Sequence, residues 1–378
     1  MEVENFLVSF FTIAPSFSII NLMIIGIDIR WLSFKGTGLY TYLSNLLDTL
    51  LKIDKKNQYV LFYNEAKERI FPLQQNLIYQ RVKARPFFLK EKVLFFGILN
   101  RAKLDIFFEP HFNLPFLLPK NLPVILTIHD LTPLLFPEFF SLPERAYFWF
   151  TLRHAVKRAN HIIAVSHYSK NSLKKMFPRL KEVSVIYPGI PKLDYNSATY
   201  IDIDIPTPYI LYVGNKRGHK NYNRVIEAYK VLRNRLSNYH LVLLGIEGKA
   251  SNKITFLKNI SEKEKAYLYN NAALLVFPSL NEGFGLPVLE AMQFGIPVIT
   301  SNLSSLPEVA GNAAYFVNPF RVDEISEGMY KTLTNEILRR QLASRGIQRS
   351  KFFCWEKAAK KYLKIFQDYG ATGCFTSI

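Results

Sequence analysis

Cysteine is nearly absent from this sequence, which has two among 378 residues. Cys354 and Cys374 both lie near the C-terminal end, and they lack the Cys-x-x-Cys spacing of zinc and redox sites. A disulfide framework and a cysteine-based zinc site are therefore excluded, and a reducing compartment fits. Glycine and proline are also modest, at 17 and 20 residues, which excludes collagen-like and low-complexity chains.

Acidic residues are in short supply relative to basic ones, with 30 against 48 and a formal net charge of +18. The basic residues are spread over both halves of the chain, without a run that would mark a charged tail. Such a surplus favours an anionic partner: nucleic acid, anionic lipid or a phosphorylated substrate. A basic surface that only keeps the chain soluble is the alternative.

The sequence also lacks an uninterrupted apolar run typical of a membrane-spanning helix. The first uncharged stretch, residues 5–27, is interrupted by Pro15 and Asn21, and acidic residues precede it where a signal peptide carries positive charge. Its last part, residues 22–29, is typical of a buried first strand. We therefore predict that residues 1–22 are an N-terminal extension, with a functional anchor as the less favoured alternative.

Short apolar runs alternate with helical patterns along the chain, which predicts parallel sheets covered by helices on both faces. The expected strands are residues 22–29, 58–63, 106–108, 124–128, 161–165, 209–213, 240–244, 255–257 and 273–277. The proline-rich stretch 186–208 separates the two halves of this α/β pattern. We predict two doubly wound domains that face each other across a cleft: residues 23–190, a linker at 191–208, residues 209–353, and a C-terminal helix at 354–378 that packs back toward the first domain.

The densest motif spans residues 277–292, where a loop with Glu282, Gly283 and Gly285 leads into a helix that carries Glu290. A helix start offers free N–H groups and the positive end of a dipole to an anion or to sugar hydroxyls. Glu290 could accept two hydrogen bonds from a ribose diol. Taken alone, the same residues could form only a tight strand-to-helix turn.

This arrangement resembles the Glu-x7-Glu signature of the retaining family 4 glycosyltransferases, and residues 293–302 and 306–314 resemble the continuation of that signature. The resemblance covers residues 23 to about 369. It implies a GT-B fold with two Rossmann-like domains. It also implies transfer of a sugar from a nucleotide donor with retention of configuration.

The resemblance assigns roles to residues of this motif. Glu290 would bind the donor ribose. Glu282 and the backbone of Phe284, Gly285 and Leu286 would hold the transferred sugar. Fixed cations and N–H dipoles would stabilise the charge that develops on the leaving nucleoside diphosphate.

Three further segments resemble donor-site elements of the family. Gly36 and Gly38 match the glycine loop near the donor phosphates and the acceptor, where a Cβ would block close backbone approach. His129 matches the active-site histidine that touches the donor sugar. Lys220 matches the lysine that binds the pyrophosphate, and Arg217 is the substitute we expect for an arginine that many relatives have at the position of Asn215.

We expect no cofactor beyond the nucleotide sugar and no metal. Asp202-Ile203-Asp204 mimics a metal-binding Asp-x-Asp, but it lies in the expected linker. Residues 128–138 look most like those of mannosyltransferases that build bacterial polysaccharide and O-antigen chains. The expected reaction is therefore transfer of a hexose, mannose first, from GDP-mannose to a glycan or lipid-linked acceptor.

Two other functions are alternatives for this sequence. A glycoside hydrolase could use Glu282 and Glu290 as an acid and nucleophile pair. A basic nucleic-acid-binding protein is supported only by the charge, without a recognisable reader motif, so we expect no nucleic-acid partner.

The expected location is cytoplasmic, with reversible contact between the first domain and an anionic membrane. Residues 81–96 alternate cations with bulky apolar side chains, as an interfacial segment would. An ordinary helix that buries Phe95 and Phe96 is the alternative.

Overall fold

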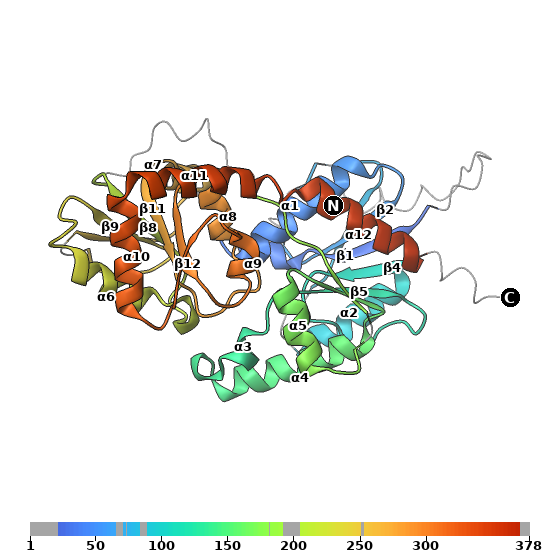
Figure 1. Cartoon of the computed structure of the whole chain (residues 1–378). Coiled ribbons are helices and arrows are strands. Elements are labelled where there is room, and N and C mark those ends of the chain that lie inside the picture. Colours follow the sequence, from blue (N-terminus) through green and yellow to red (C-terminus); the bar gives the residue numbers. More distant parts are fainter. Residues whose placement is uncertain are drawn as a thin grey trace.

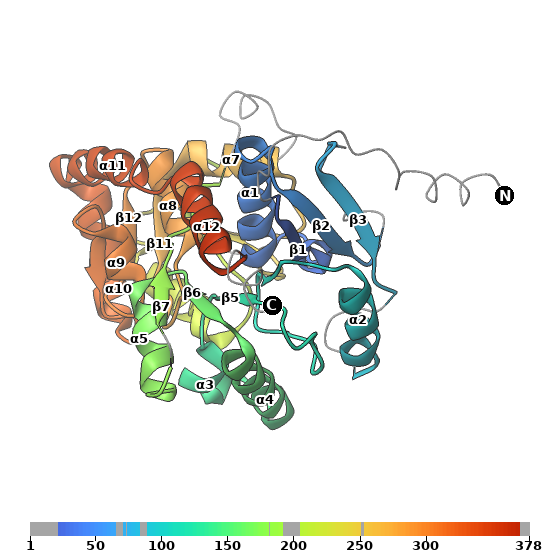
Figure 2. The same cartoon turned by 90° about the vertical axis from the view of Figure 1, so that its right-hand side faces the viewer.

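The computed structural model describes residues 22–65, 71–72, 74–83, 89–180, 182–191, 205–250 and 253–370. The described residues form two parallel β-sheets, each flanked by helices (Figure 1). Turning the molecule by 90° shows the helices of both halves packed on the faces of their sheets (Figure 2). The predicted pattern of two doubly wound α/β halves is confirmed.

The first sheet has seven strands in the order β3-β2-β1-β4-β5-β6-β7. Its strands are β1 (Ile24–Asp28), β2 (Gln58–Tyr63), β3 (Leu77–Arg81), β4 (Ile106–Glu109), β5 (Val124–Ile128), β6 (His161–Ala164) and β7 (Val183–Val185). Every residue of β4, β5 and β6 is buried, as expected for central strands covered on both faces.

The helical elements of the first half alternate with these strands. They are the 3₁₀ helix η1 (Arg30–Ser33), α1 (Gly38–Ile53), α2 (Leu89–Arg101), α3 (Thr132–Leu135), the 3₁₀ helix η3 (Pro137–Phe139), α4 (Leu142–Arg158) and α5 (His167–Met176). A capping box starts α4: the Ser141 hydroxyl accepts from the Glu144 N–H, and the Glu144 carboxylate accepts from the Ser141 N–H. This exchange satisfies backbone donors that a helix start leaves free.

The second sheet has six strands in the order β10-β9-β8-β11-β12-β13. Its strands are β8 (Tyr209–Val213), β9 (His240–Leu244), β10 (Ile254–Leu257), β11 (Ala272–Phe277), β12 (Val298–Ser301) and β13 (Tyr315–Val317). Its helices are the 3₁₀ helix η5 (Gly218–Lys220), α6 (Tyr222–Leu232), α7 (Glu262–Asn271), α8 (Leu286–Gln293), α9 (Leu306–Ala310), α10 (Val322–Thr334) and α11 (Glu336–Ser350).

The last helix, α12 (Trp355–Gly370), lies against α1 of the first half (Figure 1). The Trp355 ring meets the edge of the Tyr42 ring at 5.6 Å, and the Tyr42 and Tyr362 hydroxyls are hydrogen-bonded to each other. The buried face of α12 therefore completes the core around α1, although more than 300 residues separate the two helices in the sequence.

The elements predicted from periodicity are present with shifts of a few residues at their ends. The predictions missed β3, β7, β12 and β13, because short strands at or near the edges of a sheet lack a long apolar run. They also missed the helices α3, α5, α9, α10 and α11. Residues 1–21, most of the predicted linker and residues 371–378 lie outside the described residues.

Candidate active site

The expected site residues lie on loops at the carboxyl ends of strands in both sheets. His129 follows β5, Lys220 ends the 3₁₀ helix after β8, and Glu282 follows β11. In open α/β sheets this edge is where ligands bind. The fold thereby brings together segments that are up to about 150 residues apart in the sequence.

Lys220 and Glu282 form a direct ion pair. The Lys220 Nζ donates to both carboxylate oxygens of Glu282, at 2.7 and 2.9 Å, and Glu282 is buried. The Tyr212 hydroxyl donates to the Lys220 carbonyl at 2.9 Å and so helps to hold the lysine backbone. A partly exposed cation thus lies directly beside a buried carboxylate, at the place where the sequence predicted a phosphate and a sugar to meet.

The loop that carries Glu282 touches the loop that carries His129. A Cβ built on Gly283 would lie 1.9 Å from the His129 carbonyl oxygen, so only glycine allows this approach. The Ser169 hydroxyl lies between the two loops, at 2.9 Å from the His129 carbonyl and 3.3 Å from the Gly283 carbonyl. The two halves of the protein are therefore in contact at the candidate site.

The ring of His129 has a defined orientation. Its Nε2 lies 2.9 Å from the Pro110 carbonyl, which can only accept, so Nε2 carries a proton in either charge state. The edge of Tyr42, from the helix after the glycine loop, packs on the ring at 4.6 Å. Burial lowers the pKa of His129, against the opposing effects of the Pro110 carbonyl and Asp130. In the neutral ring, Nδ1 is left as a hydrogen-bond acceptor.

The helix start after Glu282 is shaped by Gly285. Gly285 immediately precedes α8 and has a φ of +103°. Pro287 occupies the first turn, where its missing N–H is not needed. The buried Ser305 hydroxyl lies 2.9 Å from the carbonyls of both Glu282 and Phe284 and so holds the loop from the other side. The loop that leads into the start of α8 is thus held by Gly285 at one point and by Ser305 at another.

Glu290 lies among partners that sequence analysis missed. The Lys265 Nζ donates to one carboxylate oxygen of Glu290 at 2.6 Å, and the Tyr269 hydroxyl donates to the other at 2.7 Å. Burial alone would lower the pKa of Lys265, but Glu290 and Glu262 outweigh it and raise that pKa. These contacts use two of about four lone-pair directions of the carboxylate. The spacing of Lys265 and Tyr269 put both on one face of α7, but nothing in the sequence indicated that this face meets α8.

Arg217 is directed away from the Lys220–Glu282 pair. Its guanidinium lies 4.9 Å from the Phe140 ring and 3.9 Å from the Glu144 carboxylate, both in the first half of the protein. Gly36 lies on the loop before α1 and Gly38 is the first residue of that helix; a Cβ built on either would meet nothing within 4 Å. Space above this loop is consistent with the expected approach of a ligand.

Two polar side chains of the second half bind the first half next to the site. The Asn281 Nδ2 donates to the Thr132 hydroxyl at 2.8 Å, and the Tyr168 hydroxyl donates to the Asn281 Oδ1 at 2.6 Å. The Glu308 carboxylate accepts the N–H groups of His167 and Tyr168 at 2.7 and 3.1 Å. These contacts join the loops of the site across the two halves.

Neither a metal cluster nor a membrane-spanning helix is found in the described part of the chain. Within it, no group of three or more histidine, cysteine, aspartate or glutamate residues is placed to hold a metal ion. None of its helices combines the length and the apolar character that crossing a bilayer requires.

Comparison with known proteins identifies the class of enzyme. Residues 41–192 match the family described as Glycosyltransferase Family 4, and residues 202–349 match the family described as Glycosyl transferases group 1. The fold is similar to that of WaaG, a glycosyltransferase involved in lipopolysaccharide biosynthesis, with a TM-score of 0.70, 16% identity, and 91% of this chain and 99% of that chain covered. It is also similar to sucrose-phosphate synthase from Thermosynechococcus elongatus, with a TM-score of 0.75, 16% identity, and 93% and 100% covered.

Two curated relatives of this chain are mannosyltransferases by name. The chain is 28% identical to O-antigen chain mannosyltransferase B of Escherichia coli over 71% of this chain and 76% of that protein. It is 33% identical to O-antigen chain mannosyltransferase RfbU of Salmonella typhimurium over 55% of this chain, which spans about three fifths (59%) of that protein.

The fold and the matched families together define a GT-B glycosyltransferase. The chain belongs to the glycosyltransferases of group 1 and family 4, whose two matching models together span most of its length. The family match argues against the glycoside hydrolase and the nucleic-acid-binding alternatives.

Proposed function

We propose that the chain transfers mannose from GDP-mannose to a glycan or lipid-linked acceptor in the synthesis of a cell-surface polysaccharide, with retention of configuration. The observation that carries the proposal is the contact of the Lys220–Glu282 pair with the His129 loop through Gly283. The names of the curated relatives support mannose as the sugar.

In the proposed donor complex, the Lys220 ammonium exchanges part of its contact with Glu282 for the diphosphate. Glu282 and the backbone at Phe284–Leu286 then bind hydroxyls of the sugar. The bond between the anomeric carbon and the phosphate oxygen breaks as the acceptor oxygen attacks the same face. The acceptor proton passes to the leaving phosphate oxygen, so the protein supplies position and countercharge.

Glu290 is proposed to hold the ribose. Lys265 and Tyr269 fix the direction of its carboxylate, and the two remaining lone-pair directions suit the two hydroxyls of a vicinal diol. The neutral His129 is proposed to accept a hydrogen bond from the sugar at Nδ1, because Nε2 is bound to Pro110.

The test is incubation of the full chain with a panel of nucleotide sugars, with and without lipid-linked acceptor, while release of nucleoside diphosphate is measured. GDP-mannose should be turned over fastest. The anomeric configuration of the product, read by NMR, should match that of the donor. Turnover of UDP-sugars alone would refute the mannose proposal, and an inverted product would refute the retaining mechanism.

We also propose that the enzyme works in the cytoplasm and contacts an anionic membrane reversibly through its first half. Within residues 81–96, Phe95 is buried, which favours the ordinary-helix interpretation there, while residues 84–88 and the side chains of 89–93 lie outside the description. Stronger support comes from α4, where Phe150 is 74% exposed and lies on the same face as the exposed Arg153 and Lys157.

A neighbouring loop extends this exposed face. Phe116 and Leu117 are exposed, and the loop is tied to α4 because the His154 Nε2 lies 2.9 Å from the Pro115 carbonyl. Apolar side chains bordered by cations suit the interface of an anionic bilayer. The fraction of protein that sediments with phosphatidylglycerol vesicles should decrease at high salt. It should also decrease for the variant Phe150→Ser. The control Ile337→Ser changes an equally exposed apolar residue on α11. Equal binding by both variants would refute this surface.

A further inference from the structure

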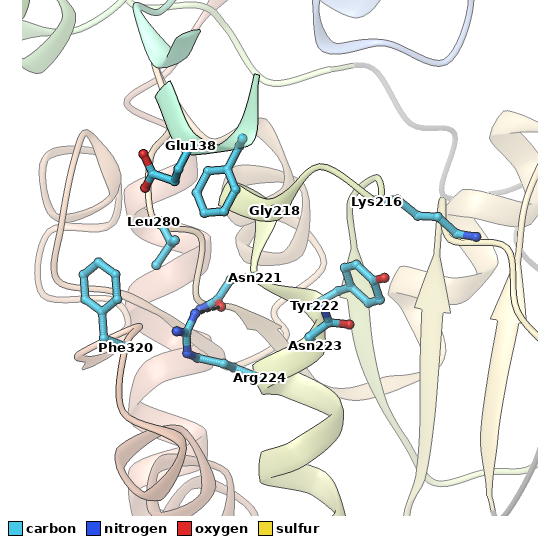
Figure 3. A pocket seen from close by; sticks show the side chains of 10 residues that line it. Glu138, Lys216, Gly218, Asn221, Tyr222, Asn223, Arg224, Leu280 and Phe320 are labelled. Carbon is cyan, nitrogen blue, oxygen red and sulfur yellow. Dashed lines mark hydrogen bonds between the residues drawn. The ribbon is translucent and has the colours of Figure 1, made fainter. Parts of the chain in front are cut away.

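A cavity of about 340 Å³ lies between the two halves of the protein, outside the site described above (Figure 3). One wall comes from η3 of the first half, with Glu138 and Phe139. The opposite wall comes from the second half, through the loop before α6 and the first turn of α6, and from Leu280 and Phe320. None of the residues that line it is among the predicted donor-site residues.

The cavity adjoins the candidate active site but lies on the other face of the second sheet from Glu290. Gly218 lines the cavity and begins the 3₁₀ turn that ends at Lys220, and Leu280 is two residues before Glu282. By contrast, α6 packs in the apolar cluster on one face of the sheet, and α8 packs in the cluster on the opposite face. A ligand in the cavity would thus lie beside the segments that carry Lys220 and Glu282 without occupying the proposed nucleotide site.

The lining combines apolar ring surfaces with a few fixed polar groups. Phe320 is 50% exposed, and the Arg224 guanidinium lies 5.7 Å from its ring centroid. Arg224 also donates to the Asn221 Oδ1 at 2.8 Å, while the Asn221 amide nitrogen is held by the carbonyls of Pro278 and Pro319. The arginine is therefore oriented before any ligand arrives, which reduces the entropy cost of binding.

This combination is suited to a carbohydrate. A sugar ring presents an apolar C–H face that packs on an aromatic ring, and hydroxyls at its edge that need donors and acceptors. Phe139 is among the lining residues. Phe320 supplies a second ring, while Glu138, Asn223 and Arg224 supply acceptors and donors (Figure 3). The volume is at the low end of the roughly 300–1,000 Å³ range of ligand sites, so it fits a short saccharide.

We infer that this cavity is a subsite for the acceptor glycan, where sugar residues next to the one that reacts are bound. The inference rests on the proposed function, because it takes the second substrate to be a saccharide. It assigns acceptor recognition to surfaces from both halves. The acceptor would then stabilise the contact between the two halves that the structure shows.

The binding test uses mannotriose and the full chain, with affinity measured by ligand-observed NMR. Phe320→Ala and Asn223→Ala should each weaken mannotriose binding about five- to tenfold, the effect of losing one aromatic or polar contact. Asn223 lies at the exposed start of α6, so its replacement by alanine does not threaten the helix. The control is Phe352→Ala, which removes a ring that is 52% exposed and does not line the cavity; it should bind like the wild type.

Two results would overturn the inference: a wild-type chain that does not bind mannotriose, or cavity variants that bind it as well as the control. GDP release from GDP-mannose is measured on the same variants with a lipid-linked acceptor present to receive the mannosyl group. Unchanged donor turnover together with unchanged mannotriose binding would refute the cavity alone. Absence of donor turnover in every variant and in the wild type would instead refute the proposed function.

Discussion

Replacement of Glu308 by glutamine should loosen the contact between the two halves of the enzyme. Glu308 belongs to the second half, and its carboxylate caps the start of α5 in the first half through the N–H groups of His167 and Tyr168. The Tyr187 hydroxyl also donates to it, at 2.8 Å. Burial and then the hydrogen bond to Glu308 raise the pKa of Tyr187, so this hydroxyl stays protonated as a donor.

The size of the effect follows from these contacts. A hydrogen bond to a charged group contributes about 1.5–3 kcal/mol, and an anion at a helix start adds about 0.3–1 kcal/mol. Glutamine keeps one acceptor oxygen but loses the charge and places an NH₂ group against a donor. Because Glu308 is only half-buried, solvent screening reduces the loss, and we expect about 2 kcal/mol, which corresponds to a roughly 30-fold change in the opening equilibrium.

Hydrogen exchange measures this opening directly. The amides of His167 and Tyr168 should exchange roughly 30-fold faster in Glu308→Gln, and amides of the central strands should not change. Glu336→Gln is the matched control, since it neutralises an exposed carboxylate that pairs with Arg340 within α11. Equal protection of the two α5 amides in wild type and Glu308→Gln would refute the idea that this carboxylate holds the halves together.

Three further outcomes are expected. Glu290→Ala and Lys220→Ala should each weaken donor binding or turnover at least about tenfold, as loss of a charge-assisted contact implies, and wild-type donor kinetics would contradict the assignment. Activity should persist in EDTA, because Lys220 supplies a countercharge for the diphosphate; complete loss that magnesium or manganese restores would point to another transferase class. Burial lowers the pKa of both His129 and His219 below the ordinary 6.5, so the folded protein favours the neutral rings. The free energy of unfolding therefore includes their full contribution above that pH and declines as the pH falls below it. A thermal midpoint that does not decrease from pH 7 to 5 would contradict this.

Local patterns were enough to predict the elements that carry Glu282 and Glu290. The Glu282 to Glu290 segment is continuous in the sequence, and its glycines and proline define a strand, a turn and a helix start without help from distant residues. Periodicity likewise predicted the central strands, because each is buried on both faces and appears as an uninterrupted apolar run.

Contacts between distant segments could not be predicted in this way. Nothing local indicates that Lys265 and Tyr269 of α7 would face Glu290, or that Arg217 would turn toward Glu144 instead of Lys220. These contacts depend on how neighbouring helices pack against each other and on how one domain is placed against the other.

The sequence by itself thus determined the two α/β halves, the family signature and the individual candidate side chains, since each depends on residues close together along the chain. Only the tertiary structure decided which of those side chains meet. The close approach of Gly283 to His129, the Glu308 cap on α5 and the cavity lined by Phe139 and Phe320 each join residues separated by more than 100 positions. Such contacts arise from packing between domains, which is encoded in complementary surfaces and not in any local pattern.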